Sequence, residues 1–191
     1  MAGYPRSLAG RIVAAWRDPA GSWRAEWAPA PSEARLVALA FGASLFLTIG
    51  PLAAEAIRPA EAFGDERAPW FAARLLIGFS FLPLSLYAVA ALLRLVSAAC
   101  GGAAPGEGGG WKACRLAFFW SALASGPVAA IVHALGAIAG ASSFGAAASG
   151  AVWLALLAPM LAAAQGFRPM RVALVFAVIA ALALLAPVAM L

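Results

Sequence analysis

Long apolar segments separated by short polar ones make up most of this chain. The apolar segments cover about residues 36–57, 70–98, 115–138, 146–165 and 170–190. An α-helix rises about 1.5 Å per residue, so about 20 apolar residues cross the roughly 30 Å hydrocarbon core of a bilayer. The pattern therefore predicts an all-α integral membrane protein, in which residues 35–191 form a bundle of five transmembrane helices.

Residues 1–34 differ from the rest because they are rich in tryptophan, arginine and proline. Within them, Leu8, Ile12, Val13 and Trp16 fall on one side of a helix that should end at Asp18-Pro19. Tryptophan and arginine favour the lipid headgroup layer. We therefore expect a cytoplasmic amphipathic leader lying on the membrane surface, the alternative being that it packs on the protein's own bundle. The candidate contacts with the membrane surface are Arg11, Trp16, Arg17, Trp23, Arg24 and Trp27.

Basic residues are distributed unevenly between the two sides of the predicted bundle. One side has Arg6, Arg11, Arg17, Arg24, Arg35, Arg94, Lys112, Arg115, Arg168 and Arg171, and the other has Arg58, Arg67 and Arg74. Loops rich in arginine and lysine stay in the cytoplasm. The count predicts a cytoplasmic N-terminus, and an odd number of spans then places the C-terminus on the opposite, periplasmic side.

Composition leaves little room for a soluble domain. The chain is 64% hydrophobic and 11% charged, with a mean hydropathy of +0.92, whereas soluble domains are about half apolar and a quarter charged. The net charge of +5 comes from arginines beside apolar spans. The expected partners are therefore anionic lipid headgroups on the cytoplasmic side and a membrane protein or a second copy of the chain, and not nucleic acid.

The sequence contains no pattern typical of catalysis. The spacing of Cys100 and Cys114 fits no zinc or redox motif, and the single histidine, His133, lies elsewhere. We expect both cysteines to be reduced, with lipidation or a disulfide as alternatives. No nucleophile motif, zinc-protease motif or phosphate-binding loop occurs. We predict a protein that is not an enzyme and that has no cofactor or metal.

Each predicted span contains one proline, namely Pro51, Pro83, Pro127, Pro159 or Pro187. A proline bends a helix, and several bends can shape a cavity or a hinge. The simpler interpretation is that proline is common in membrane helices.

Three ionisable residues are predicted to lie in the outer leaflet: Glu55, Arg74 and His133. A charge inside the membrane is costly unless it is paired, so we expect Glu55 to approach Arg74 or His133 as a polar clamp. Glu55 and Arg74 can alternatively extend to the interface. A proton-linked or metal-linked site is the functional alternative, although one histidine and one carboxylate make a poor ligand set.

Several segments together resemble a known family. A Trp/Arg-rich leader precedes PSEARLVALAFGASLFLTIGPLA, and FLPLSLYAVAALLRL, a glycine loop and WKACRLAFFWSALASGP follow. Over residues 10–165 the chain resembles the bacterial branch of the Yip (Ypt/Rab-interacting protein) family. The resemblance implies five membrane helices, a cytoplasmic N-terminal segment and no enzymatic activity. The arginine-rich, lysine-poor composition favours a bacterial inner membrane.

Three functions fit the sequence. The first is a non-catalytic scaffold that binds a protein partner or lipid. The second is a small transporter or channel, in which His133 and the proline bends line a path. The third is an accessory subunit of a photosynthetic or respiratory complex.

Overall fold

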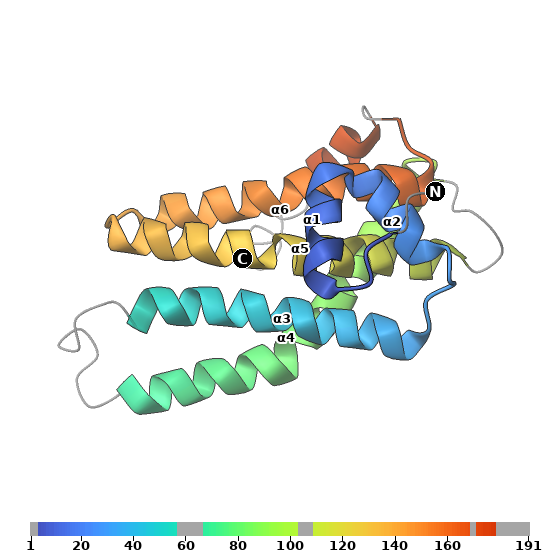
Figure 1. Ribbon diagram of the computed structural model, residues 1–191. Helices are drawn as coiled ribbons and strands as arrows, with labels where there is room; N and C mark the ends of the chain where they lie inside the picture. Colours follow the sequence, from blue (N-terminus) through green and yellow to red (C-terminus); the bar gives the residue numbers. More distant parts are fainter. Residues whose placement is uncertain (1–3, 57–66, 103–108, 169–170, 179–191) are drawn as a thin grey trace.

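A computed structural model describes residues 4–56, 67–102, 109–168 and 171–178 of the chain. Within them lie six helices (Figure 1): α1 (Leu8–Arg17), α2 (Pro19–Trp27), α3 (Glu33–Ala56), α4 (Arg67–Ala99), α5 (Gly109–Ile138) and α6 (Ser142–Gln165). Residues 171–178 are also helical.

Four helices of the described residues, α3 to α6, are long and apolar enough to cross a membrane. They correspond to the first four predicted spans, and each begins a few residues before the predicted start. Only residues 171–178 of the fifth predicted span belong to the described part of the chain, and Pro187 lies outside it. The fifth crossing therefore stays a prediction.

The long helices form two antiparallel pairs, α3 with α4 and α5 with α6 (Figure 1). Helix α6 packs along α5, and α3 packs between α5 and α4. The leader helix α2 packs on α5 and α6 near one end of the bundle, and α1 packs on α5 farther along its length. In the described residues, this arrangement makes α5 the helix that touches every other layer.

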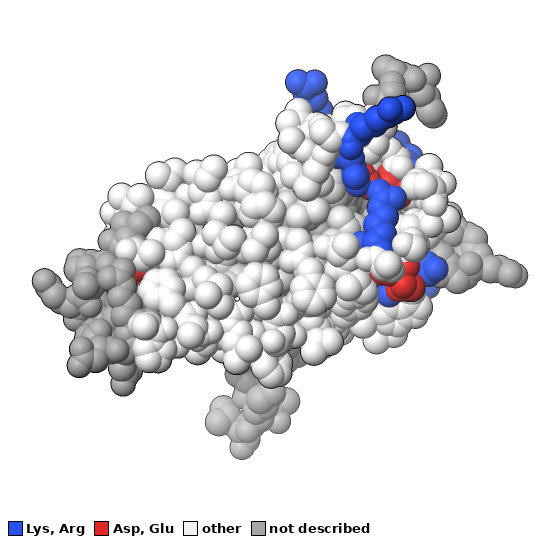
Figure 2. All heavy atoms as spheres, turned by 60° about the horizontal axis from the view of Figure 1, so that its bottom comes forward, with Lys and Arg blue, Asp and Glu red and all other residues white. Residues whose placement is uncertain are grey.

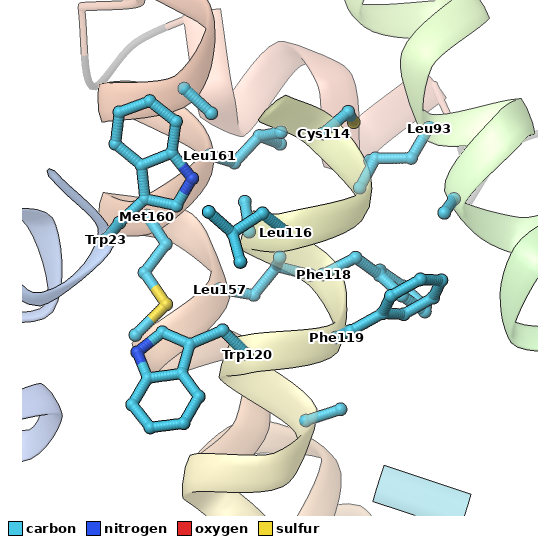
Figure 3. Packing of buried hydrophobic residues seen from close by; sticks show 14 of the residues in the cluster. Trp23, Leu93, Cys114, Leu116, Phe118, Phe119, Trp120, Leu157, Met160 and Leu161 are labelled. Carbon is cyan, nitrogen blue, oxygen red and sulfur yellow. The ribbon is translucent and has the colours of Figure 1, made fainter. Parts of the chain in front are cut away.

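Buried side chains of α5 fill the space between these layers. Figure 3 shows Leu157 and Met160 of α6 on one side of α5 and Leu93 of α4 on the other. Phe118, Phe119 and Trp120 of α5 are all buried. The Phe119 ring lies 4.8 Å from the ring of Tyr87 in α4, and the Phe118 ring lies 5.1 Å from that of Trp153 in α6. These aromatic contacts join three of the four long helices.

A glycine pair lets α5 and α6 meet closely at the far end of their hairpin. A Cβ atom on Gly136 would lie 2.6 Å from the Gly145 Cα atom. Gly140, which the sequence pairs with Gly136 as a GxxxG, instead ends α5 with a φ of +69° and has open space around it. The close approach therefore uses Gly136 with Gly145 rather than with Gly140.

The prolines of the four described spans all lie inside helices. Helix starts and ends also follow the sequence. The Ser32 hydroxyl accepts a hydrogen bond from the Arg35 amide (3.2 Å), as expected for a residue that caps α3. Gly166 ends α6 with a φ of +63°, a conformation that favours glycine.

Candidate functional site

A buried carboxylate holds the leader helices on the bundle. The Glu26 side chain, in α2, is 0% exposed. It accepts hydrogen bonds from Arg11 Nε (2.6 Å) and Nη2 (2.5 Å), from the Tyr4 hydroxyl (2.9 Å) and from Arg35. Two cations and a phenol thus satisfy one carboxylate, which is the condition for burying a charge.

The partners of Glu26 come from different parts of the chain. Arg11 lies in α1 and Arg35 lies in the first turn of α3, so the carboxylate joins the two leader helices to the first long helix. Asp18 ends α1 and also caps α2, since its side chain accepts a hydrogen bond from the Gly21 amide (2.8 Å). The sharp turn at Asp18 is what places Arg11 opposite Glu26.

The ionisation of the leader residues reflects this burial. Burial raises the pKa of the Tyr4 phenol; the hydrogen bond with Ser22 opposes this change, and the Glu26 charge adds to it. Burial opposes the charge on Arg11, but the hydrogen bonds and charge of Glu26 outweigh it and raise the pKa of the guanidinium. At neutral pH, Tyr4 is therefore protonated and neutral, and Arg11 is positively charged.

Indole N–H groups connect the leader to α5. Trp120 of α5 donates to the Ser22 hydroxyl (2.9 Å), and Trp23 donates to the Ala113 carbonyl (3.4 Å). Trp16 donates to the Ala124 carbonyl (3.1 Å), and the Arg11 guanidinium lies 5.2 Å from the centre of the Trp120 ring. The leader is thus packed on the bundle through both charge and aromatic contacts.

The six predicted membrane-surface residues divide into two groups. Arg11 and Trp23 face protein, because Glu26 and the α5 backbone supply partners that lipid headgroups would otherwise supply. Trp27 is half-buried and stacks on Trp23, with ring centres 5.6 Å apart. Contact of these three residues with lipid headgroups stays a prediction, and it is limited by the protein contacts that each of them makes.

The other three, Trp16, Arg17 and Arg24, are exposed. Leu8 and Val13 of α1 are exposed as well, whereas Ile12 packs against the core and Trp16 donates to the Ala124 carbonyl, so half of the predicted apolar face points away from the bundle. Contact of this face with lipid stays a prediction.

Charged side chains gather at the leader end of the bundle (Figure 2). Arg115 of α5 forms two hydrogen bonds with the Glu33 carboxylate, at 2.7 and 2.9 Å. Arg94 donates to Gln165 (3.4 Å), and Arg171 donates to the Gly101 carbonyl (3.3 Å). Basic residues predicted to share one side of the membrane therefore do lie at one end of the helices. Which side of the membrane this end faces stays a prediction.

The predicted polar clamp has a different environment at each of its residues. The Arg74 guanidinium lies 5.1 Å from the centre of the Trp70 ring. His133 lines a cavity between the long helices. In the described part of the chain, no ion pair joins Glu55 to either of them. Their association as one clamp stays a prediction.

The cavity beside His133 has a volume of about 400 Å³ and is bounded by α3, α4, α5 and α6. Aromatic rings and small residues form most of its wall, including Phe46, Phe118, Trp153 and Gly150. Its size falls in the range of small-molecule sites, about 300–1,000 Å³. The sequence offered a cavity lined by His133 and the proline bends as one alternative, and Pro51 and His133 do line this cavity. The rest of the wall could not be predicted, because it comes from residues of four different helices.

Cys100 and Cys114 are both free, as expected. No group of three potential metal-ligating side chains occurs within the described residues. These side chains add no further site.

Sequence reasoning missed the Glu26 cluster. Glu26 is the one glutamate in the first 32 residues, between Trp23 and Trp27. A single glutamate among arginines and tryptophans was the signal that could have indicated a buried ion pair.

Comparison with models of protein families, with curated proteins and with solved structures finds no match. The four apolar helices indicate an integral membrane protein. Membership of the Yip family stays a prediction.

Proposed function

We propose that this chain is a non-catalytic, Yip-like integral membrane protein of the bacterial inner membrane, which acts as a scaffold for a protein partner or for lipid. The observation that carries the proposal is the leader fixed on the end of the bundle by buried Glu26. Two short helices held in one position present a constant surface. Such a surface favours specific binding because little conformational entropy is lost when a partner binds.

The lipid side of the proposal rests on α1. Trp16 reaches the carbonyl of Ala124, more than ten residues beyond the start of α5, so α1 lies well down the side of the bundle. Leu8 and Val13 are exposed, and Val13 is one helical turn from exposed Arg17. Apolar and basic residues together are typical of helices at the boundary between headgroups and acyl chains.

The interior of the bundle favours a scaffold over a channel. Two of the polar residues that line the cavity, Ser125 and Ser149, donate to backbone carbonyls of their own helix pair. Buried polar groups that are satisfied in this way do not need water. The described helices thus offer mostly apolar surface where a conducting path would need polar groups.

Extraction in native lipid tests the scaffold proposal. We would compare wild type with Glu26→Gln, which loosens the leader, and with Glu33→Gln as a matched control at an exposed carboxylate. The expected result is that a defined partner or a stoichiometric amount of anionic lipid stays bound to wild type and Glu33→Gln and is lost from Glu26→Gln. Equal retention by all three would contradict a role for the leader surface.

A small transporter is the second candidate, and the cavity lined by His133 is the observation that favours it. Flux through proteoliposomes that disappears in His133→Ala would support a transporter and count against a scaffold.

A further inference from the structure

We infer that the cavity beside His133 binds a neutral, lipid-soluble ring that carries a carbonyl or hydroxyl group, the chemical class of the membrane quinones. This inference goes beyond the proposed scaffold function and does not depend on it. Four observations support it: the location of the cavity, its walls, its only ionisable group, and the space at Gly150.

The location indicates how a ligand arrives. The cavity extends along α5 from Phe118 to His133, which is about 22 Å at about 1.5 Å per residue. Leu47 and Val89, which line it, are 42% and 44% exposed. These side chains belong to helices that are apolar enough to cross a membrane. The cavity therefore opens onto the hydrocarbon layer, and its ligand must be soluble in lipid.

The walls favour a flat body. Phe46, Phe118 and Trp153 supply aromatic surface from three different helices. Between them lie alanine and glycine positions of α5 and α6, which leave room for a ring. Aromatic rings prefer offset-stacked or edge-to-face contact with other rings.

His133 sets the polarity of the ligand. In the described part of the chain, its imidazole forms no hydrogen bond, whereas Ser125 and Ser149 are satisfied by backbone carbonyls. An imidazole can donate or accept one hydrogen bond at each nitrogen. His133 is half-buried. A hydrocarbon chain in the cavity would leave its imidazole without a hydrogen bond on the cavity side, and an unsatisfied polar group in an apolar layer is costly. A carbonyl or hydroxyl on the ligand would satisfy it.

The lining also argues against a charged ligand. The lining residues include no lysine or arginine, and His133 is their only ionisable group. A fatty acid or phospholipid headgroup would bring a negative charge to a position inside the membrane without a firm cationic partner, which is costly. A neutral ring with one or two oxygens is the class that fits both the walls and the histidine.

Gly150 provides a way to fill the cavity. It lines the cavity, and a Cβ atom built on it meets nothing within 4 Å. Gly150→Leu should therefore occupy the ligand space without displacing backbone. Ala151→Leu, one residue along and exposed, adds similar volume on the outer face of α6 and is the matched control.

The test uses the full chain in nanodiscs, with decylubiquinone as the probe and quenching of tryptophan fluorescence as the signal. Decylbenzene, which has the same tail on a ring without oxygens, is the comparison ligand. We expect saturable binding of decylubiquinone that is abolished in Gly150→Leu and unchanged in Ala151→Leu. His133→Phe should weaken binding about 5- to 10-fold, as for one lost hydrogen bond, while His133→Gln should stay within about 3-fold of wild type because it keeps a donor and an acceptor.

Three outcomes would overturn the inference. Equal binding of decylbenzene, with no effect of His133→Phe, would mean that the cavity holds acyl chains. Quenching that persists unchanged in Gly150→Leu would mean that the quinone only dissolves in the lipid. Marked loss of thermal stability in Gly150→Leu, but not in Ala151→Leu, would mean that protein already fills the space.

Discussion

Removing the charge of Glu26 should release the leader from the bundle. Glu26→Gln keeps the shape of the side chain but loses the carboxylate that receives hydrogen bonds from Arg11, Arg35 and Tyr4. Breaking a buried ion pair by removing one partner costs about 3–5 kcal/mol. The two arginine side chains are 22% and 32% exposed, so water can partly hydrate them. We therefore expect the lower end of the range, about 3 kcal/mol, or roughly a 100-fold rise in the open state.

Trypsin cleavage of the leader measures this change, because cleavage follows the population of the open state when closing is fast. Nanodiscs of neutral lipid prevent the released arginines from binding anionic headgroups. Glu33→Gln is the matched control, since its carboxylate is 54% exposed and also pairs with an arginine. An exposed pair contributes at most about 1 kcal/mol, so cleavage should rise less than about 5-fold. Equal acceleration in the two variants would refute the view that burial makes Glu26 the anchor.

Further predictions concern pH, packing and topology. Because the folded pKa of Tyr4 is raised, its contribution to leader docking is complete below the unfolded value of about 10 and is lost as the pH rises through the folded value; subtilisin cleavage should accelerate there in wild type and show no such step in Tyr4→Phe. Gly136→Ala places a Cβ atom 2.6 Å from the Gly145 Cα atom, so it should destabilise the protein by about 1–3 kcal/mol and lower its Tm in detergent. Gly150→Ala, where the new Cβ atom meets open space, should leave the Tm unchanged. A similar loss of Tm in both variants would contradict close packing at Gly136. Reporter tags should place the N-terminus in the cytoplasm and residues 139–141 in the periplasm, and both in one compartment would contradict the assigned orientation.

The four long helices could be predicted because a helix that crosses a bilayer needs a continuous apolar stretch, and such a stretch can be recognised from neighbouring residues alone. The predicted ranges marked the apolar spans, and the helices begin a few residues before them. Helices α3, α4 and α5 begin at Glu33, Arg67 and Gly109, in polar sequence that still forms helix. Hydropathy marks where lipid begins, whereas backbone hydrogen bonding continues beyond it.

The site could be predicted only in part, because it depends on contacts between residues far apart in the chain. Trp23 was expected at the membrane surface, but nothing in the local sequence indicates that Trp120 donates to Ser22, the residue before Trp23. Likewise, His133 was recognised as unusual at membrane depth, whereas the cavity beside it depends on how α3, α4, α5 and α6 are arranged around it. The pattern of apolar residues predicts where helices lie in the sequence, but it does not predict which helices pack against each other.

The distribution of anchoring partners along the chain sets an order for biogenesis. Among the described residues, the partners of the Glu26 carboxylate all belong to the first 35 positions, so this ion cluster can close as soon as the first long helix leaves the ribosome. The indole bonds reach Ala113, Trp120 and Ala124, which are synthesised much later. During synthesis, the ion cluster of the leader can therefore form first, and the leader can dock on α5 only after this third long helix has been inserted.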